Sequence, residues 1–275
     1  MKIIFDIGCN EGQNLEYYLK KADYVVGIEA NPYLTNKIKT KFKKNILEKK
    51  LFIENATLSN KEKKIIFFIN KKKNYLSQVV KPKEMSGYNK INVKTVKTNK
   101  IIKKYLNKFN LKKIEFIKLD IESSTEEVLE DMLNNKILPK FLSVEAQTPK
   151  ILELILKSNY KSFKFINGSD IGTKLKKLKI INKLKKRINH TFQVHSAGPY
   201  GMDISGKYYS KNSLVSYFLN SGFGWKDINC YINKSTEYAK IEYNKDLHKQ
   251  GFKFHFEKMI SEFFKSLKNK FNNDE

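Results

Sequence analysis

The sequence predicts an α/β fold built on a doubly wound, mostly parallel sheet. Three observations predict it. The apolar run at residues 3–7 ends at Gly8, and Gly12 follows before a helical pattern begins, as at the end of a buried strand. A second apolar run, at residues 24–29, ends at Glu29. Beyond it, strand-like and helix-like patterns alternate, as parallel strands with helical crossovers require.

In the first third of the chain, the expected elements follow from periodicity and from residues typical of helix ends. We expect strands at 2–7, 24–29 and 50–56, a further strand at 65–69, and helices at 13–21 and 32–47. Asn31 suits the N-cap of the second helix, and Pro32 suits its first turn. The lysine-rich stretch at 71–90 is expected to be a long loop, which is usually functional or mobile.

The middle of the chain continues the alternation. We expect helices at about 98–109, 124–134 and 149–157, and strands at 114–120, 141–145 and 162–166. After Gly168 the pattern becomes unclear. We therefore divide the chain into a core at 1–168 and a C-terminal extension at 169–275, packed on the core as one domain.

Acidic residues stand in or at the ends of several predicted strands. Ligands of doubly wound sheets bind beyond the carboxyl ends of the strands, so Asp6, Glu29, Asp120 and Glu122 should converge on one crevice. Glu145 ends its strand on the same rim. Glu29 lies about 20 residues beyond the glycine loop, an offset at which a carboxylate can bind two ribose hydroxyls. Asp6 belongs to the first strand and is expected to orient the glycine loop.

Several of these stretches make the chain resemble the FkbM family of S-adenosylmethionine-dependent methyltransferases. The matching stretches are FDIGCNEG at 5–12, EANP at 29–32, NATLS at 55–59, FIKLDIE at 116–122 and SAGPYGMD at 196–203. The resemblance covers roughly residues 2–205. The chain departs from the family pattern at Ser123 and Thr125, where the family usually has a glycine and a second glutamate. A role for that second acid is therefore not carried over.

The resemblance implies a Rossmann-like methyltransferase fold, S-adenosylmethionine as cofactor, and an acceptor-binding C-terminal part. We expect the donor to be bound by Asp6, Gly8, Cys9, Asn10, Gly12, Glu29, Ala30, Asn55, Ala56 and Asp120. The Cys9 thiol has no paired base or second cysteine, so we expect it to pack in the loop rather than to act as a nucleophile.

The resemblance also implies O-methylation of a sugar, a glycan or another small hydroxylated metabolite. The candidate general bases are Asp120, Glu122 and His195. The spacing of histidines and cysteines supports no transition metal, and a magnesium ion on Asp120 and Glu122 is left open. The alternatives are an RNA or DNA methyltransferase, a nicotinamide-dependent oxidoreductase, which would need a three-glycine loop, and a binding module without activity.

The formal net charge of +26 in 275 residues suggests polyanion binding, yet Arg187 is the only arginine among 54 basic residues. We attribute most of this charge to compositional bias, and we do not expect a nucleic-acid partner. Residues 174–188 form a locally denser basic stretch with a three-and-four apolar repeat, typical of an amphipathic helix. It is expected either to pack on the sheet as a surface helix or to act as a lid that attracts an anionic acceptor or contacts an acidic membrane surface.

The cysteine content and the start of the chain bear on the cellular compartment in which the protein is expected. The two cysteines, Cys9 and Cys230, indicate no disulfide framework, and the first strand begins at Lys2 without an apolar leader. No apolar run approaches the length of a membrane span. We therefore expect a cytoplasmic protein.

Overall fold

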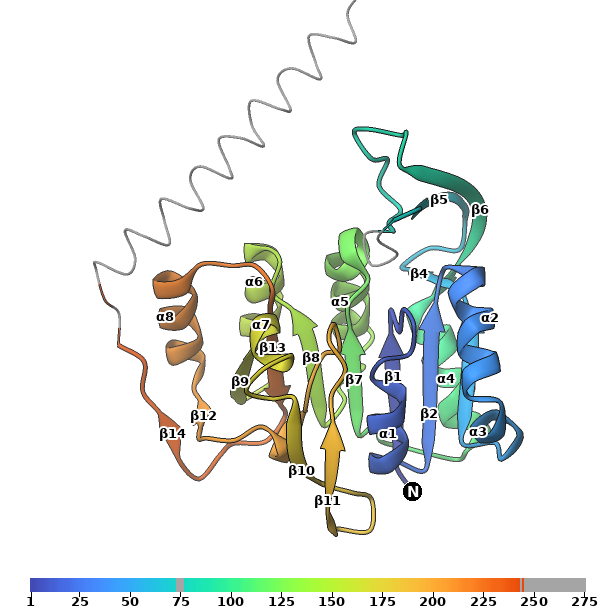
Figure 1. Cartoon of the computed structure of the whole chain (residues 1–275). Coiled ribbons are helices and arrows are strands. Elements are labelled where there is room, and N and C mark those ends of the chain that lie inside the picture. The colour runs from blue at the N-terminus through green and yellow to red at the C-terminus, as the bar shows by residue number, and fades with distance from the viewer. Residues whose placement is uncertain (73–76, 243, 245–275) are drawn as a thin grey trace, which may run out of the picture.

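The computed structural model describes residues 1–72, 77–242 and 244, and within them a nine-stranded sheet forms the centre of the molecule (Figure 1). Its order is β14-β12-β9-β13-β8-β7-β1-β2-β3. The strands are β1 (Ile3–Ile7), β2 (Tyr24–Glu29), β3 (Leu51–Asn55), β7 (Phe116–Leu119), β8 (Phe141–Glu145), β9 (Ser162–Asn167), β12 (Tyr208–Tyr209), β13 (Lys226–Tyr231) and β14 (Tyr238–Ala239).

The five strands from β3 to β8 in this order are parallel. β13 inserts between β8 and β9 and runs antiparallel to both. The sheet is therefore mostly parallel over the half that forms the crevice, and the predicted Rossmann-like fold class is confirmed. Strands from beyond residue 168 complete this sheet, and the last part of the expected C-terminal extension, 245–275, lies outside the described residues.

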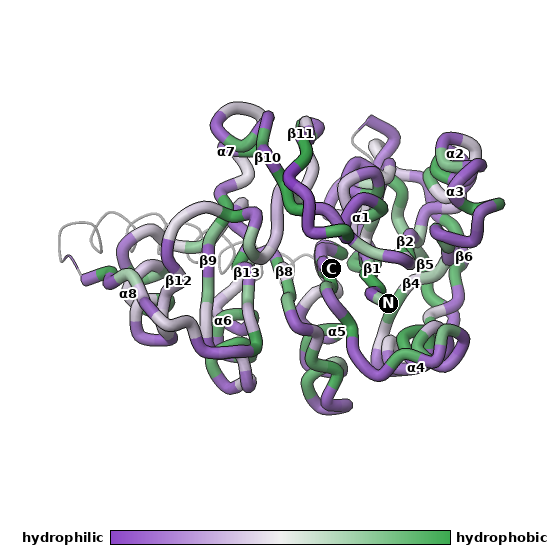
Figure 2. The backbone as a smooth tube through the Cα atoms, turned by 90° about the horizontal axis from the view of Figure 1, so that it is seen from below, coloured by the Kyte–Doolittle hydropathy of each residue, from purple (hydrophilic) through white to green (hydrophobic). Residues whose placement is uncertain are grey.

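Helices and a hairpin cover the two faces of the sheet in three layers (Figure 2). The helices are α1 (Leu15–Lys21), α2 (Pro32–Lys41), α3 (Lys43–Leu47), α4 (Thr98–Lys108), α5 (Thr125–Asn134), α6 (Pro149–Lys157), α7 (Gly168–Ile171) and α8 (Lys211–Ser221). α4, α5, α6 and α8 pack their apolar side chains into one core cluster, while α1 and α2 belong to a second cluster on the other face. In the part of the chain described here, no helix is both long and apolar enough to cross a membrane.

The predicted helix at 32–47 is divided. Its start is as expected, because the Asn31 side chain accepts a hydrogen bond from the Tyr33 N–H and Pro32 occupies the first turn. Phe42 then leaves the helical region at φ −107° and ψ 23°, and its ring is buried, so that α3 begins as a separate short helix. The four-residue apolar repeat could not reveal this break.

The predicted amphipathic helix at 174–188 is wrong. The stretch contributes to a β-hairpin of β10 (Lys177–Ile181) and β11 (Arg187–Thr191), in which Ile180 pairs with Ile188. Ile180 is fully buried, whereas Leu184, in the turn, is 68% exposed. Apolar residues at this spacing satisfy either a helix or two short alternating strands, and packing of Ile180 and Phe192 against the α1 side of the sheet stabilises the strands.

A small second sheet follows β3. It consists of β4 (Thr57–Ser59), β5 (Lys64–Asn70) and β6 (Tyr88–Lys97) in the order β4-β6-β5. In Figure 1 its strands β5 and β6 extend beyond the carboxyl ends of the parallel strands. The loop expected at 71–90 is shorter than predicted because β6 begins at Tyr88, and residues 73–76 lie outside the described part.

Candidate functional site

The glycine loop after β1 lies between the ends of two neighbouring strands. The backbone N–H groups of Gly8 and Cys9 donate to the Ile28 carbonyl oxygen of β2, at 2.9 and 3.1 Å. Gly8 has φ +80°, and a Cβ atom there would lie 1.8 Å from the Asp120 carbonyl oxygen. The sheet order reverses between β1 and β7, so this loop marks the place where doubly wound sheets bind ligands.

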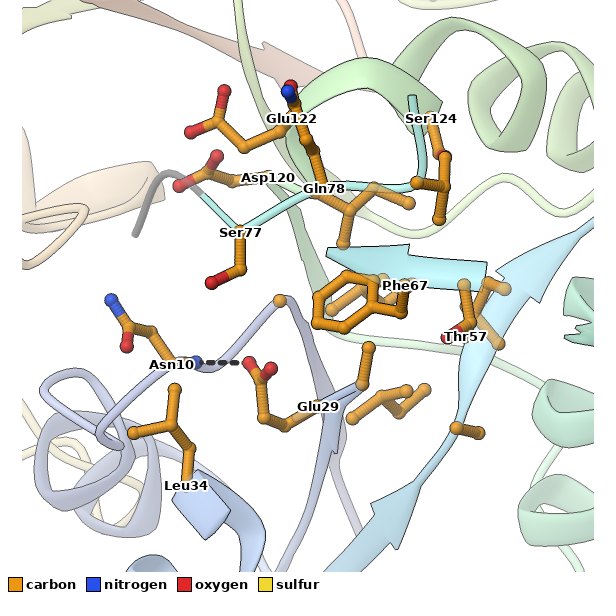
Figure 3. Close-up of a pocket in the computed structure, with 18 residues that line it drawn as sticks. Asn10, Glu29, Leu34, Thr57, Phe67, Ser77, Gln78, Asp120, Glu122 and Ser124 are labelled. Atoms are coloured by element: carbon orange, nitrogen blue, oxygen red, sulfur yellow. Dashed lines mark hydrogen bonds between the residues drawn. The ribbon is translucent and has the colours of Figure 1, made fainter. Parts of the chain in front are cut away.

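A first cavity, of about 710 Å³ including its open mouth, lies on the β2 side of this loop. Figure 3 shows Asp120 and Glu122 along one side of it, and Glu29 with Asn10 on the opposite side. Its other lining residues are mainly apolar or small and come from the ends of β1 and β2, from β4 and β5, and from residues 77–79: Ile7, Gly8, Ile28, Ala30, Leu34, Ala56, Thr57, Leu58, Phe67, Ser77, Gln78, Val79, Ile121 and Ser124. This mainly apolar lining, with a few polar groups at one point, suits a nucleoside.

Glu29 is held in place at the base of this cavity. One carboxylate oxygen accepts the Asn10 N–H at 2.8 Å and the other accepts the Asn31 N–H at 2.9 Å. Burial raises the pKa of Glu29 to about 7, although these two hydrogen bonds and Lys118 favour its charged form. A carboxylate oxygen can accept more than one hydrogen bond, so two hydroxyl donors of a ribose fit this group chemically.

The other predicted donor-binding residues divide into two sets. Gly8, Asn10, Ala30, Ala56 and Asp120 line the first cavity together with Glu29. Gly12 and Asn55 do not appear among its lining residues. Instead the Asn55 amide donates to the carbonyl oxygens of Glu29 and Ala30, at 2.9 and 3.0 Å, and so fixes the end of β2.

Asp6 and Cys9 also lie outside the first cavity. Asp6 is completely buried in β1, and Cys9 is buried facing Gly27. Burial raises the pKa of the Cys9 thiol well above its usual value, which suits the packing role expected of it and not a nucleophilic one.

Lys118 connects the glycine loop with the end of β7. Its buried ammonium donates to the Gly8 carbonyl oxygen at 2.9 Å and lies 3.1 Å from an Asp120 carboxylate oxygen and 3.9 Å from one of Asp6. Burial lowers the pKa of Lys118, but the two carboxylates outweigh it and hold this pKa above its usual range. For Asp6 burial has the opposite effect, because it disfavours a negative charge. It raises the pKa of Asp6 to about 6, and the positive charge of Lys118 offsets part of this rise. Lys118 thus lies between Asp6 and the glycine loop, with its ammonium close to both.

A second cavity, of about 1050 Å³ including open solvent, lies on the other side of the glycine loop. It shares Gly8, Asn10, Asp120 and Glu122 with the first. The rest of its lining comes from the start of α1, from the end of β8 and from two distant loops: Cys9, Gln13, Asn14, Lys118, Glu145, Gln147, His195 and Trp225. The two cavities therefore meet at the carboxyl ends of β1 and β7.

The polar lining on this side includes three carboxylates, those of Asp120, Glu122 and Glu145. The Gln147 amide donates to Glu145 at 2.7 Å and to Glu122 at 3.4 Å. Burial, and then the charge of Asp120, raise the pKa of Glu122 to about 7 and that of Glu145 to about 8. One oxygen each from Asp120, Glu122 and Glu145 lie within 4.8 Å of one another, an arrangement that can hold a cation.

His195 lines the second cavity, where its predicted role requires it to be. Its ring is stacked on that of Trp225 with centroids 6.0 Å apart. His190, by contrast, is buried against Tyr17 and Phe192 on the α1 side of the sheet. His248 and His255 lie outside the described residues.

Sequence reasoning missed Gln147, Trp225 and Asp227, and it placed Glu145 only on the rim. Asp227 is paired with Glu145 across β13 and β8, so that an acid at the start of an antiparallel strand reaches the edge where parallel strands end. The alternation of apolar residues that identifies a strand gives no information on its partner or direction. Glu145 alone had a usable signal, since it ends a predicted parallel strand.

The hairpin turn lies far from both cavities. The Lys183 N–H donates to the Lys20 carbonyl oxygen of α1, and its ammonium lies 3.3 Å from Asp23, just before β2 begins. In Figure 1 this turn is at the opposite end of the sheet from the carboxyl ends of β1 and β7. The basic residues of the turn therefore do not cover the crevice.

Comparison with known proteins gives one family match. The profile described as "Methyltransferase FkbM domain" matches residues 6–165, which is more than half of the chain. No curated protein matches.

Two solved structures are similar to this chain at low sequence identity. The FkbM methyltransferase from Methylobacillus flagellatus is 12% identical, with a TM-score of 0.41 over 60% of this chain and 40% of that one. TrmK from M. capricolum, in complex with S-adenosylhomocysteine, is 13% identical, with a TM-score of 0.39 over 97% of this chain and 80% of that one. The chain thus spans less than half the length of the Methylobacillus protein.

Proposed function

The chain belongs to the FkbM family of S-adenosylmethionine-dependent methyltransferases, and from this premise we propose that it methylates a hydroxyl oxygen of a sugar, a glycan or another small hydroxylated metabolite. The observation that supports this proposal is the pair of cavities that meet at Gly8, Asn10, Asp120 and Glu122. Methyl transfer is an in-line displacement that needs donor and acceptor aligned on either side of one point. Two cavities with a common boundary supply that arrangement.

The first cavity suits the donor. Glu29 would accept the ribose hydroxyls, and the apolar surface near Leu58 and Phe67 would contact the adenine. The bare backbone at Gly8 would leave room for the amino-acid end beside Asn10. S-adenosylmethionine supplies a sulfonium methyl group when bound, and these residues would hold it in one orientation.

The second cavity suits a hydroxylated acceptor. Trp225 is 53% exposed and offers an apolar face against which the C–H face of a sugar ring can pack. Carboxylates and amides around it, at Glu122, Glu145 and Gln147, can accept or donate hydrogen bonds to several hydroxyls. The reacting hydroxyl would lose its proton to a group in this cavity, and Asp120, Glu122 and His195 are the candidates, joined by Glu145.

A methyl-transfer screen with labelled donor tests the proposal. The acceptors are free sugars, nucleotide sugars, glycans and RNA. We expect transfer to a hydroxyl oxygen of a free sugar, a nucleotide sugar or a glycan, and preferred transfer to RNA would overturn this choice of acceptor in favour of a nucleic-acid methyltransferase.

Variants of the second cavity then identify the proton acceptor. Asp120→Asn, Glu122→Gln and Glu145→Gln keep the side-chain shape, and His195→Gln replaces the imidazole by a neutral amide. The four variants should lower turnover unequally, with the largest loss, on the order of 10²-fold, at the base. Donor affinity is measured for each variant, so that a loss of turnover can be separated from a loss of binding. Near-native turnover in all four would show that the proton leaves by another route.

A further inference from the structure

Few basic side chains among the described residues offset the negative charge of the acceptor cavity. Asp120, Glu122 and Glu145 line the second cavity, and Asp227 lies with Asp120 and Glu145 around an adjoining hollow of about 330 Å³. Among the described residues that line these spaces, Lys118 is the only lysine or arginine, and its ammonium already contacts Gly8, Asp6 and Asp120. A chain with a net charge of +26 has many lysines, yet no other lysine in the described part of the chain lines these two spaces.

The spacing of the carboxylates fits one small cation. The three oxygens from Asp120, Glu122 and Glu145 lie within 4.8 Å of one another. Two oxygens on opposite sides of a calcium ion, each at about 2.4 Å, are about 4.8 Å apart, and magnesium needs only slightly closer ligands. The Gln147 amide links Glu122 and Glu145 and holds them at this spacing, but as a neutral group it does not offset their charge.

An orphaned hydroxyl in the adjoining hollow points to the same conclusion independently. Ser196 lines this hollow together with Asp120 and Glu145, and the residue is only 4% exposed. Its Oγ atom is buried without a hydrogen-bond partner within the described part of the chain. A buried hydroxyl without a partner costs free energy. Its oxygen has almost no surface open to the hollow, so the Ser196 side chain must rotate before a ligand there, or the water that the ligand carries, can satisfy it.

We propose that Asp120, Glu122 and Glu145 bind a hard divalent cation, Mg²⁺ or Ca²⁺, at the acceptor side of the crevice. All-oxygen, carboxylate-rich ligand sets favour these two ions over softer metals. The remaining coordination positions face the cavity and take water or two hydroxyls of the acceptor, which orients the acceptor against the donor. This second role rests on the proposed function, whereas cation binding does not. With the carboxylates acting as ligands, His195 remains as the base.

Calorimetry on the full-length, chelator-treated protein tests cation binding without any acceptor. Titration with MgCl₂ and with CaCl₂, in the presence of S-adenosylhomocysteine, should show one saturable site for at least one of them. Glu145→Gln and Glu122→Gln should each weaken it about tenfold or more, because each removes a charged ligand. Glu130→Gln is the matched control: Glu130 is an exposed acid on α5 outside the cluster, and its substitution should leave the affinity unchanged.

The outcomes separate the two proposals. No saturable site for either ion, or equal affinity in wild type, Glu145→Gln and Glu130→Gln, overturns the cation site and leaves the methyltransferase proposal intact. Since the net charge of +26 repels cations, non-specific binding should be weak.

Thermal melting of each variant checks that it is folded. Ser196→Ala, which leaves the carboxylates in place, should lower the cation affinity only a fewfold. Saturable binding with no methyl transfer in any screen would instead sink the acceptor proposal alone.

Discussion

The two cavities differ in how the chain builds them. The donor cavity is formed by residues from 7 to 79, together with 120–124, so it depends mainly on consecutive strand ends. The acceptor cavity combines five separate parts of the chain, at residues 8–14, 118–122 and 145–147, at His195 and at Trp225. Each cavity is lined by three acids, and Asp120 and Glu122 are common to both. The third acid of the donor cavity is the buried Glu29, beside much apolar surface, and the third acid of the acceptor cavity is Glu145. A short motif can therefore encode the first, while the second depends on the topology of the whole sheet.

Gly8 is common to both cavities, so its substitution should have the largest effect. In Gly8→Ala the new methyl group would meet the Asp120 carbonyl oxygen at 1.8 Å, and φ +80° is unfavourable for alanine. Overpacking and backbone strain together should lower the free energy of unfolding by about 3 kcal/mol. Donor affinity and turnover should fall together, because the ends of β1 and β7 must separate. Thermal melting and donor calorimetry measure both.

Gly206→Ala separates the two causes of that loss. Gly206 also has φ +80°, but a Cβ atom there meets nothing within 4 Å. Gly206→Ala should therefore lower the free energy of unfolding only through backbone strain at positive φ, by about 1 kcal/mol, and leave donor binding unchanged. If the two alanine variants lose equal stability, the close contact between the glycine loop and β7 is not the reason that glycine is required.

Glu29→Ala tests the donor cavity alone. The variant removes the acid at the end of β2, and with it the charge-assisted hydrogen bonds to the ribose. Binding of S-adenosylmethionine should therefore weaken by about 1.5–3 kcal/mol. Cation binding on the acceptor side should not change. Calorimetry with each ligand distinguishes these effects, and wild-type donor affinity in the variant, or tighter binding of NAD than of S-adenosylmethionine to the native chain, would contradict the assignment.

The pKa of Glu29 adds a pH dependence to the same test. Burial raises this pKa from its usual 4.5 to about 7 in the unliganded protein, so the folded state favours the protonated acid, and its contribution to stability is lost as pH rises from about 4.5 to 7. Donor binding has the opposite sign, since the ionised carboxylate is the better hydrogen-bond acceptor. Affinity should fall about tenfold from pH 8 to pH 6. Glu29→Gln should remove this slope, and an unchanged slope would assign it to another carboxyl.

Sequence reasoning was strongest where local patterns decide the structure. The parallel strands, Asn31 as N-cap, and Glu29 at the end of β2 follow from apolar runs and terminal residues, and the structure places them as expected. Lys118 was part of a motif, but its contact with Gly8 depends on β1 and β7 being neighbours. That adjacency follows from fold topology and not from any local pattern.

Predictions failed where two structures share one pattern. The apolar repeat at 174–188 fits a helix, yet burial of Ile180 and pairing with Ile188 favour a hairpin. Trp225 and Asp227 could not be assigned to the site because β13 inserts antiparallel between β8 and β9. No periodicity within residues 226–231 indicates which strands will flank it.

The basic hairpin gives the last and smallest expected effect. If lysines at 174–188 attracted an anionic acceptor, their replacement would raise the acceptor KM, and added salt would mimic it. The structure leads us to expect otherwise for the turn. A five-residue strand such as β1 spans about 16 Å, roughly twice the Debye length of about 8 Å at physiological salt, so charges at the far edge of the sheet are screened from the crevice. Lys183→Gln with Lys186→Gln should therefore change the acceptor KM by less than about twofold.

Lys174→Gln with Lys176→Gln, close to α7, is the matched pair at the other end of the hairpin. A salt-sensitive rise in KM in the turn variant, or its loss of binding to anionic vesicles, would restore an electrostatic role for this surface. An effect confined to the second pair would place attraction of an anionic acceptor next to the crevice.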